Sequence, residues 1–245
     1  MNYKTKLNEL FNIQKPIIGM IHLAGNNEKE KIIRALEELT IYEEGQVNGA
    51  IIEDYHGEMY DVYDTLKEAV KLNYNLVLGV NVLRNPYLGL NWADALGGKF
   101  AQFDSVQSNN LSEKHHKIMR EKYSNVLIFG GIRFKYTAPS NKTLEQDLKE
   151  GMSRCDAIVT TGEGTGIETP IEKLQQFNNY LKEFPLIVGA GLNASNAYKQ
   201  LQIADGAIVG SFFKPNKNTC LPVDKYLVRD LMDIVKEARK DNLEN

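Results

Sequence analysis

The sequence predicts an α/β protein with a single-domain (β/α)8 fold, the TIM-barrel architecture. Short runs rich in Val, Ile and Leu alternate with segments of helical periodicity along the whole chain. Eight such units occupy 245 residues, the usual size of a (β/α)8 barrel. No linker or change in composition divides the chain, so we predict one domain over 1–245, with 1–15 as a short N-terminal lead-in. An open doubly wound sheet is the alternative, because periodicity alone does not show closure.

Each predicted strand is short and nearly continuous in apolar residues, as strands buried in a parallel sheet are. The predicted strands span 16–21, 49–54, 76–82, 99–104, 126–132, 156–161, 185–191 and 206–211.

The segments between the strands have helical periodicity. In 28–45, Ile32, Ile33 and Leu36 mark one face and Gly45 stands where a C-cap belongs. The other predicted helices span 61–72, 85–97, 112–123, 142–152, 170–184, 194–202 and 223–240. Trp92 is expected in the core, and His116 on a solvated helix face.

Composition excludes several classes of function. A net charge of −3 gives no basic face for nucleic acid, and no segment is long and apolar enough to span a membrane. The first residues lack a secretory signal, and the two cysteines, Cys155 and Cys220, suit a reducing compartment, so we expect a cytoplasmic protein. The cysteines form no CxxC motif, and neither a cofactor nor a metal site is indicated. Self-association is common among barrels, so a homo-oligomer is compatible with the sequence, which does not locate an interface.

In such barrels the working face is built from the carboxyl ends of the strands, where this chain has several polar residues. The catalytic candidates there are Glu53, Asp54, His22 and Lys135, and the substrate-binding candidates are Asn81, Arg84, Asp104, Thr161 and Gly162.

Each of these candidates also has a structural interpretation. Successive strand residues point to opposite faces, so only one of Glu53 and Asp54 is expected to face the barrel mouth. Either carboxylate could instead hold a loop or pair with Arg84, and His22 could be a hydrogen-bonded core residue. Anion binding by Lys135 is favoured over a Schiff base, because Arg133 is expected on the same face.

The last three loops are rich in glycine and predict an anion site. Glycine lets backbone N–H groups approach a phosphate closely, and barrels often hold phosphate at the loops after strands seven and eight. The predicted phosphate-binding residues are Gly189, Gly191, Asn193, Gly210, Ser211 and Lys214. Glycines also simply end strands, and no P-loop or GxGxxG spacing is present.

Several of these segments together resemble the BtpA/SgcQ family. They are GMIHL at 19–23, NVLRN at 81–85, TGEGTG at 161–166, GAG at 189–191 and ADGAIVGSFFK at 204–214. The resemblance runs over nearly the whole chain. It implies a TIM barrel related to phosphate-binding barrels, with one branch named for photosystem I biogenesis and another found beside sugar-uptake and sugar-phosphate functions.

The chain also departs from the family pattern. The family's strand five typically reads D-V-x-V-K-H, whereas the aligned positions here include Gly131, Arg133, Lys135 and Tyr136, so only the lysine persists. If the missing aspartate and histidine are catalytic in relatives, this chain acts on another substrate or has lost the chemistry.

The sequence thus predicts an enzyme acting on a small phosphorylated metabolite, a sugar or nucleoside phosphate, by acid–base chemistry. Such an enzyme would be a lyase, an isomerase or a hydrolase. The alternative is a non-catalytic binding or assembly factor that keeps the barrel and its anion pocket. A metal-dependent hydrolase using Glu53, Asp54 and His56 ranks last, because clustered histidine ligands are absent from the sequence.

Overall fold

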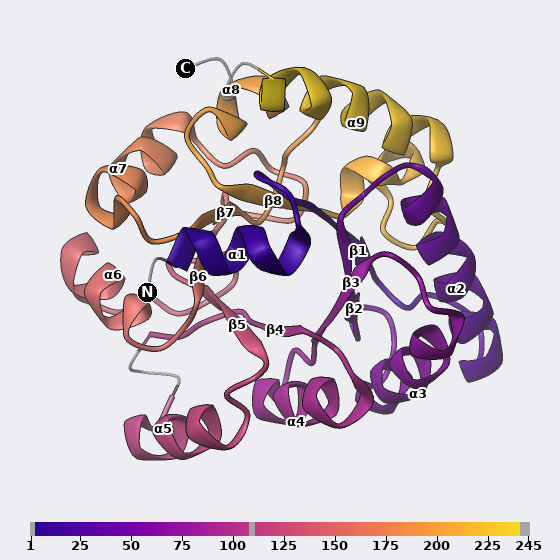
Figure 1. The fold of residues 1–245 in the computed structure, drawn as a ribbon, viewed down its shortest axis with the longest axis horizontal. Helices are drawn as coiled ribbons and strands as arrows, with labels where there is room; N and C mark the ends of the chain where they lie inside the picture. Colours follow the sequence, from indigo (N-terminus) through magenta and orange to yellow (C-terminus); the bar gives the residue numbers. More distant parts are fainter. Residues whose placement is uncertain (1–2, 108–110, 241–245) are drawn as a thin grey trace.

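The eight strands form a closed parallel barrel in chain order, which confirms the predicted (β/α)8 fold (Figure 1). The computed structural model describes residues 3–107 and 111–240. The strands are β1 (Ile17–Ile21), β2 (Gly49–Glu53), β3 (Val77–Asn81), β4 (Phe100–Phe103), β5 (Leu127–Gly131), β6 (Ala157–Thr160), β7 (Leu186–Val188) and β8 (Gly206–Val209). Parallel pairing of β1 with β8, with Ile17 opposite Ala207, closes the barrel and excludes the open sheet.

Every predicted strand exists, and each is somewhat shorter than its apolar run. The largest difference is at β7, which ends at Val188, so that Gly189 and Gly191 lie in the following loop. The polar residues at the predicted strand ends therefore lie at or just beyond the carboxyl rim, where a barrel places its functional groups.

Helices cover the outside of the barrel (Figure 1). They are α2 (Glu28–Glu44), α3 (Met59–Ala69), α4 (Pro86–Leu96), α5 (Glu113–Lys122), α6 (Leu144–Met152), α7 (Ile171–Leu181), α8 (Ala197–Leu201) and α9 (Lys225–Lys240), with short 3-10 turns η1 (Val70–Leu72), η2 (Ser211–Phe213) and η3 (Pro215–Lys217). Capping hydrogen bonds are present at the N-termini of several of these helices. The side chain of Asn27 accepts from the N–H of Glu30 at the start of α2, and Thr143 and Gln146 form a capping box on α6.

Gly45 occupies the predicted C-cap of α2, but for a different reason than expected. Its backbone is right-handed, with φ −77°, so no left-handed turn requires glycine there. A Cβ at this position would lie 2.4 Å from Cγ1 of Val228 on α9. Glycine is needed because α2 and α9 pack closely at this point.

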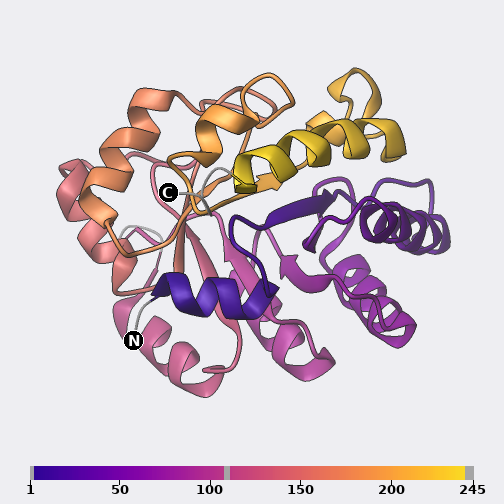
Figure 2. The same cartoon turned by 45° about the horizontal axis from the view of Figure 1, so that its top comes forward.

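The predicted lead-in contains a helix, α1 (Tyr3–Phe11), that lies across the amino end of the barrel (Figure 2). Leu7 and Phe11 are buried, and the ring of Phe11 lies 5.9 Å from that of Phe100 at the start of β4. The interior residues Phe100 and Phe129 stack at 4.6 Å, and with α1 they fill that end of the barrel.

A second, larger core lies between the strands and the outer helices. Trp92 belongs to it, as predicted. The expectation for His116 was wrong, because its Nε2 lies 2.8 Å from the carbonyl oxygen of Arg154 and the ring is buried. Among the described residues, no helix combines the length and apolar character that crossing a membrane requires.

Candidate functional site

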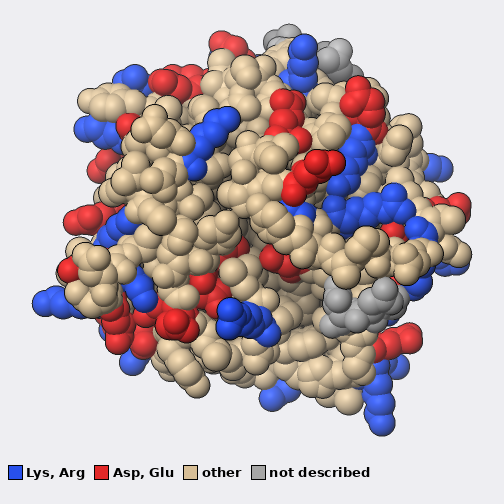
Figure 3. Space-filling model, turned by 180° about the vertical axis from the view of Figure 1, so that it is seen from behind, with Lys and Arg blue, Asp and Glu red and all other residues tan. Residues whose placement is uncertain are grey.

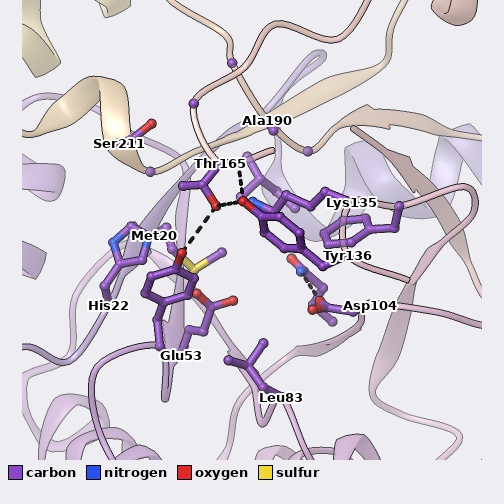
Figure 4. Close-up of a pocket in the computed structure, with 18 residues that line it drawn as sticks. Met20, His22, Glu53, Leu83, Asp104, Lys135, Tyr136, Thr165, Ala190 and Ser211 are labelled. Atoms are coloured by element: carbon purple, nitrogen blue, oxygen red, sulfur yellow. Dashed lines mark hydrogen bonds between the residues drawn. The ribbon is translucent and has the colours of Figure 1, made fainter. Parts of the chain in front are cut away.

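The carboxyl ends of the strands surround a cavity of about 260 Å³, which we call the mouth cavity. Figure 3 shows the face opposite α1, with a hollow near its centre and acidic atoms visible inside it. The lining residues come from the ends of most strands and their loops (Figure 4): Met20, His22, Glu53, Tyr55, Leu83, Gln102, Asp104, Phe134, Lys135, Tyr136, Thr165, Gly166, Gly189, Ala190, Gly191, Ile208, Gly210 and Ser211. Eight of the predicted site residues are among them: Glu53, His22, Lys135, Asp104, Gly189, Gly191, Gly210 and Ser211.

Three neighbouring strands place a polar network, the acidic floor, at the base of this cavity, where the buried Asn81 lies behind the three side chains that line it. The floor consists of Glu53 at the end of β2, Asn81 at the end of β3, and Gln102 and Asp104 on and after β4. Asn81 Nδ2 donates to Glu53 Oε1 at 2.8 Å and to Asp104 Oδ1 at 3.0 Å, and Gln102 Nε2 donates to the same Asp104 oxygen at 2.9 Å. The amide groups therefore hold the two carboxyl groups close together.

Glu53 is buried, and its surroundings favour the protonated form. Burial, followed by the negative charge of Asp104, raises the pKa of Glu53 to about 8, although Lys135 and the hydrogen bond from Asn81 act in the opposite direction. At neutral pH the side chain is therefore a neutral carboxylic acid that can donate a proton.

Asp54 points away from the cavity, as the alternation of strand side chains predicts for one of the two neighbouring carboxylates. Its Oδ1 accepts from the backbone N–H of Leu83 at 2.9 Å, which fixes the turn after β3. The structure assigns Asp54 a loop-holding contact and leaves Glu53 as the carboxyl group of β2 in the cavity.

His22 follows β1 and lines the cavity with a buried ring. Burial, followed by the positive charges of Lys214 and His56, holds the pKa of His22 well below its usual range, so the ring is neutral. Its Nδ1 has no hydrogen-bond partner among the described residues. A neutral imidazole with an unused nitrogen can accept or donate one hydrogen bond to a ligand.

Lys135 reaches the cavity, whereas Arg133 does not share its face as expected. β5 ends at Gly131, and Arg133 has a left-handed φ of 47°, so strand alternation stops before these residues. Arg133 instead forms an ion pair with Asp147 at 3.0 Å on the outside. Lys135 Nζ lies 5.7 Å from the centre of the Phe134 ring, and its charge acts on Glu53.

The opposite wall of the cavity, the glycine wall, consists of Gly166, Gly189, Gly191, Gly210 and Ser211. Within the described part of the chain, the N–H groups of Gly166 and Gly191 donate to no other residue. Gly191 has φ +75°, and a Cβ there would lie 2.3 Å from the carbonyl oxygen of Ile167. The loops after β6 and β7 can approach this closely only with glycine.

Lys214 does not line the mouth cavity. It is fully buried, and its Nζ donates to Glu38 Oε1 at 2.9 Å and to the carbonyl oxygen of Leu221 at 3.0 Å. Burial lowers its pKa, and Glu38 acts in the opposite direction. The exposed Lys217 lies beside the glycine wall, with its Cδ 4.0 Å from the position of a Cβ on Gly166.

The remaining predicted site residues lie around the cavity rather than in it. Arg84 is exposed, and Asn193 Oδ1 accepts from the N–H of Ser195 at 2.9 Å in the loop before α8. Thr161 Oγ1 accepts from the N–H of Lys135 at 2.7 Å and so positions that residue, while Gly162 packs against the carbonyl oxygen of Glu168. These four residues support loops of the site.

Three residues lie across the mouth, of which the sequence pointed to Tyr136 and to the loop of Thr165 but not to Tyr55. The hydroxyl of Tyr55, after β2, and that of Tyr136, after β5, each lie 3.4 Å from Thr165 Oγ1, and the N–H of Thr165 donates to Tyr136 at 3.0 Å (Figure 4). Gln102 was also missed, although its place two residues before Asp104 puts both on one strand face. Tyr55 carried no such signal, because it lies in a loop.

Comparison with known proteins agrees with this architecture. The family model for the BtpA family matches residues 13–237. A protein of Archaeoglobus fulgidus is 31% identical over 82% of this chain and 92% of its own length. The photosystem I biogenesis protein BtpA of Synechocystis sp. is 26% identical over 95% of this chain and 92% of its own.

Solved structures with a similar fold share little sequence with the chain. N-(5'-phosphoribosyl)anthranilate isomerase from Pyrococcus furiosus has a TM-score of 0.61 at 15% identity, covering 91% of this chain and 99% of its own. Tryptophan synthase subunit alpha from Legionella pneumophila has a TM-score of 0.64 at 11% identity, covering 97% and 99%. At these identities the likeness shows the fold alone.

Proposed function

The chain belongs to the BtpA family, and on that premise we propose that it is a barrel enzyme that acts on a small phosphorylated metabolite by acid–base chemistry. The observation that carries the proposal is the composition of the mouth cavity. A neutral carboxylic acid, Glu53, and a cation, Lys135, line the same 260 Å³ space as the glycine wall. A single ligand in this cavity could therefore contact both the groups that transfer a proton and the groups that bind an anion.

The glycine wall supports binding of the phosphate group. The N–H groups of Gly166 and Gly191 are available as donors, and the hydroxyl of Ser211 lines the same wall. Lys217, whose Cδ lies 4.0 Å from the position of a Cβ on Gly166, is the cation that we propose for the phosphate in place of Lys214. The phosphorylated substrate named for the Pyrococcus furiosus isomerase is consistent with this use of the fold.

The opposite side of the cavity supports the chemistry. A phosphate on the glycine wall places the remainder of a sugar or nucleoside phosphate against Glu53, Lys135 and His22. Glu53 gives a proton to a substrate oxygen, and Lys135 stabilises negative charge on that oxygen before the proton arrives. An isomerase, a lyase or a hydrolase can use these groups.

The first experiment is a thermal-shift titration of the protein with phosphate, sulfate and a panel of sugar and nucleoside phosphates, since a ligand of the folded state raises the melting temperature. We expect one phosphorylated compound to shift it selectively. Lys217→Met and Ser211→Ala should each weaken its binding by about tenfold, the loss expected for one hydrogen bond to a charged group. Lys199→Met, which removes an exposed lysine of α8, is the matched control.

The compound that shifts the melting temperature is then incubated with wild-type protein and Glu53→Gln, and the product is followed by NMR. Turnover by the wild type and binding without turnover by the variant would support the enzyme. Binding without turnover by either protein would favour the non-catalytic binding or assembly factor, the kind of role that the name of the Synechocystis relative describes. A flat response to the whole panel would contradict the phosphate site.

A further inference from the structure

The two carboxyl groups of the acidic floor are held by one nitrogen atom. Glu53 and Asn81 occupy paired positions on β2 and β3, and Asp104 follows the next strand, β4. Asn81 Nδ2 donates to Glu53 Oε1 at 2.8 Å and to Asp104 Oδ1 at 3.0 Å. Since an amide nitrogen has two hydrogens, each carboxyl group receives one.

These contacts leave one oxygen of each carboxyl group for a ligand. Asp104 Oδ1 also accepts from Gln102 Nε2 at 2.9 Å, so both donors reach the same oxygen. Among the described residues, neither Glu53 Oε2 nor Asp104 Oδ2 has a hydrogen-bond donor, and both side chains line the mouth cavity. The buried Oε1 of Gln102, which lines the same cavity, has no partner either. The floor therefore presents unused polar atoms to a bound molecule.

We propose that Glu53 and Asp104 work as one acid–base pair held by Asn81, and that the pair catalyses isomerisation of the bound metabolite by proton transfer. The proposal rests on the proposed function and narrows its reaction class. Glu53 gives its proton to a carbonyl oxygen of the substrate while Asp104 takes a proton from the neighbouring carbon, which leaves an enediol. In the second half Asp104 returns a proton to the former carbonyl carbon, and Glu53 takes one from the adjacent hydroxyl. Both groups then regain their first protonation states, and no other reactant is needed.

The charges around the pair are consistent with this division of roles. The negative charges of Asp104 and, more weakly, Asp54 favour a proton on Glu53, while Lys135 and Asn81 oppose it. Burial has the largest effect, and with it the pKa of Glu53 is raised to about 8. At neutral pH Glu53 is therefore the acid of the pair. A carboxylic acid next to a carboxylate is the arrangement that lets one site give and accept a proton.

The electrostatic effect of Asp104 on the pKa of Glu53 can be measured without any substrate. Carboxyl carbons of glutamate are labelled with ¹³C, the Glu53 signal is assigned by its loss in Glu53→Gln, and its pH titration is recorded in wild type, Asp104→Asn and Asp54→Asn. We expect Glu53 to titrate near 8 in the wild type. Asp104→Asn should lower this pKa, and the matched variant Asp54→Asn should lower it less. Titration near 4.5 in the wild type, or equal effects of the two variants, would overturn the pair.

Asn81 is tested as a positioning residue by Asn81→Leu, which keeps the branching of the side chain at Cγ and removes both donors. Loss of the hydrogen bond should raise the Glu53 pKa further, because that bond favours the ionised form. An unchanged titration would contradict the role of Asn81. Circular dichroism shows whether each variant folds.

The reaction class is tested in deuterium oxide with the compound that binds. The wild type should exchange the transferred hydrogen for deuterium, and Glu53→Gln and Asp104→Asn should each slow this by 100-fold or more, as expected for loss of a general acid or base. Turnover without exchange would overturn isomerisation through a solvent-exchanging base. If no compound binds, the proposed function fails while the titration still decides the pairing. If a compound turns over although Glu53 titrates near 4.5, the pair fails and the enzyme stands.

Discussion

The carboxyl group of Glu53 makes the stability of the protein depend on pH. Its pKa is about 8 when folded and near 4.5 when unfolded, so between these values the folded state binds a proton more strongly. The contribution of this group is fully present below pH 4.5 and is lost as the pH rises through 8.

We predict that Glu53→Gln removes this dependence. From pH 6 to pH 9, the free energy of unfolding of the wild type should fall by about 2–3 kcal/mol relative to the variant, at roughly 1.4 kcal/mol per pH unit up to the folded pKa. Urea unfolding at the two pH values measures the difference. Parallel behaviour of the two proteins would show that Glu53 titrates normally.

Lys214 and Lys217, three residues apart in the sequence, should respond differently to substitution by Met. Lys214→Met removes one of two cationic partners of the buried carboxylate of Glu38, which keeps Arg34 at 3.0 Å, and should cost about 1–3 kcal/mol of unfolding free energy. Lys217→Met removes an exposed charge and should change stability by less than about 0.5 kcal/mol while weakening phosphate binding. Urea unfolding and ligand titration on both variants check this, and a stable Lys214→Met would contradict the assignment.

Strand alternation predicted the direction of a side chain correctly where the strand continues and wrongly where the strand has ended. Glu53 and Asp54 obey alternation because Glu53 still belongs to β2. Arg133 and Lys135 do not, because β5 has already ended and Arg133 turns with positive φ. The sequence pointed to Lys214 as a binder of negative charge, but it did not reveal that the negative charge is Glu38, which lies far away in sequence on α2.

At the scale of elements, α1 contributes to the interior core through few side chains. Phe11→Ala should cost about 3–5 kcal/mol of unfolding free energy, because the ring packs against Phe100 and Phe129 and its removal leaves a cavity. Glu9→Ala, on the exposed face of the same helix, is the matched control. Chemical denaturation of both variants tests this, and equal stabilities would mean that α1 is only loosely attached.

The close contact between the loops after β6 and β7 should make the protein sensitive to an added methyl group at Gly191. Gly191→Ala combines positive φ with a Cβ 2.3 Å from the carbonyl oxygen of Ile167, so we expect more than about 3 kcal/mol of destabilisation and loss of phosphate binding. Gly97→Ala also has positive φ, but nothing lies within 4 Å, and should cost only about 1 kcal/mol. Thermal unfolding with and without ligand separates the two effects. Similar losses in both variants would show that contact between the loops is unimportant.

The order and type of the barrel elements were predictable because each strand and its following helix have distinct periodicities. α1 was missed, since a nine-residue helix without a preceding strand lies outside the βα repeat that organises the rest. Its burial depends on Phe100 and Phe129, which come from strands much later in the chain.

At the scale of the whole molecule, closure between β1 and β8 makes the first and last parts of the chain structurally dependent on each other. We therefore predict one unfolding transition. Fluorescence of Trp92, the single tryptophan, and far-ultraviolet circular dichroism should give the same midpoint in urea. Two separated midpoints would show that the chain contains more than one folding unit.

The position of α1 also affects how small molecules would pass through the proposed site. With one end of the barrel filled by α1 and its aromatic neighbours, a reactant bound in the mouth cavity and the molecule formed from it must share one entrance. The product must therefore leave the cavity before the next substrate molecule can bind. In steady-state kinetics we therefore expect the product to inhibit competitively with the substrate.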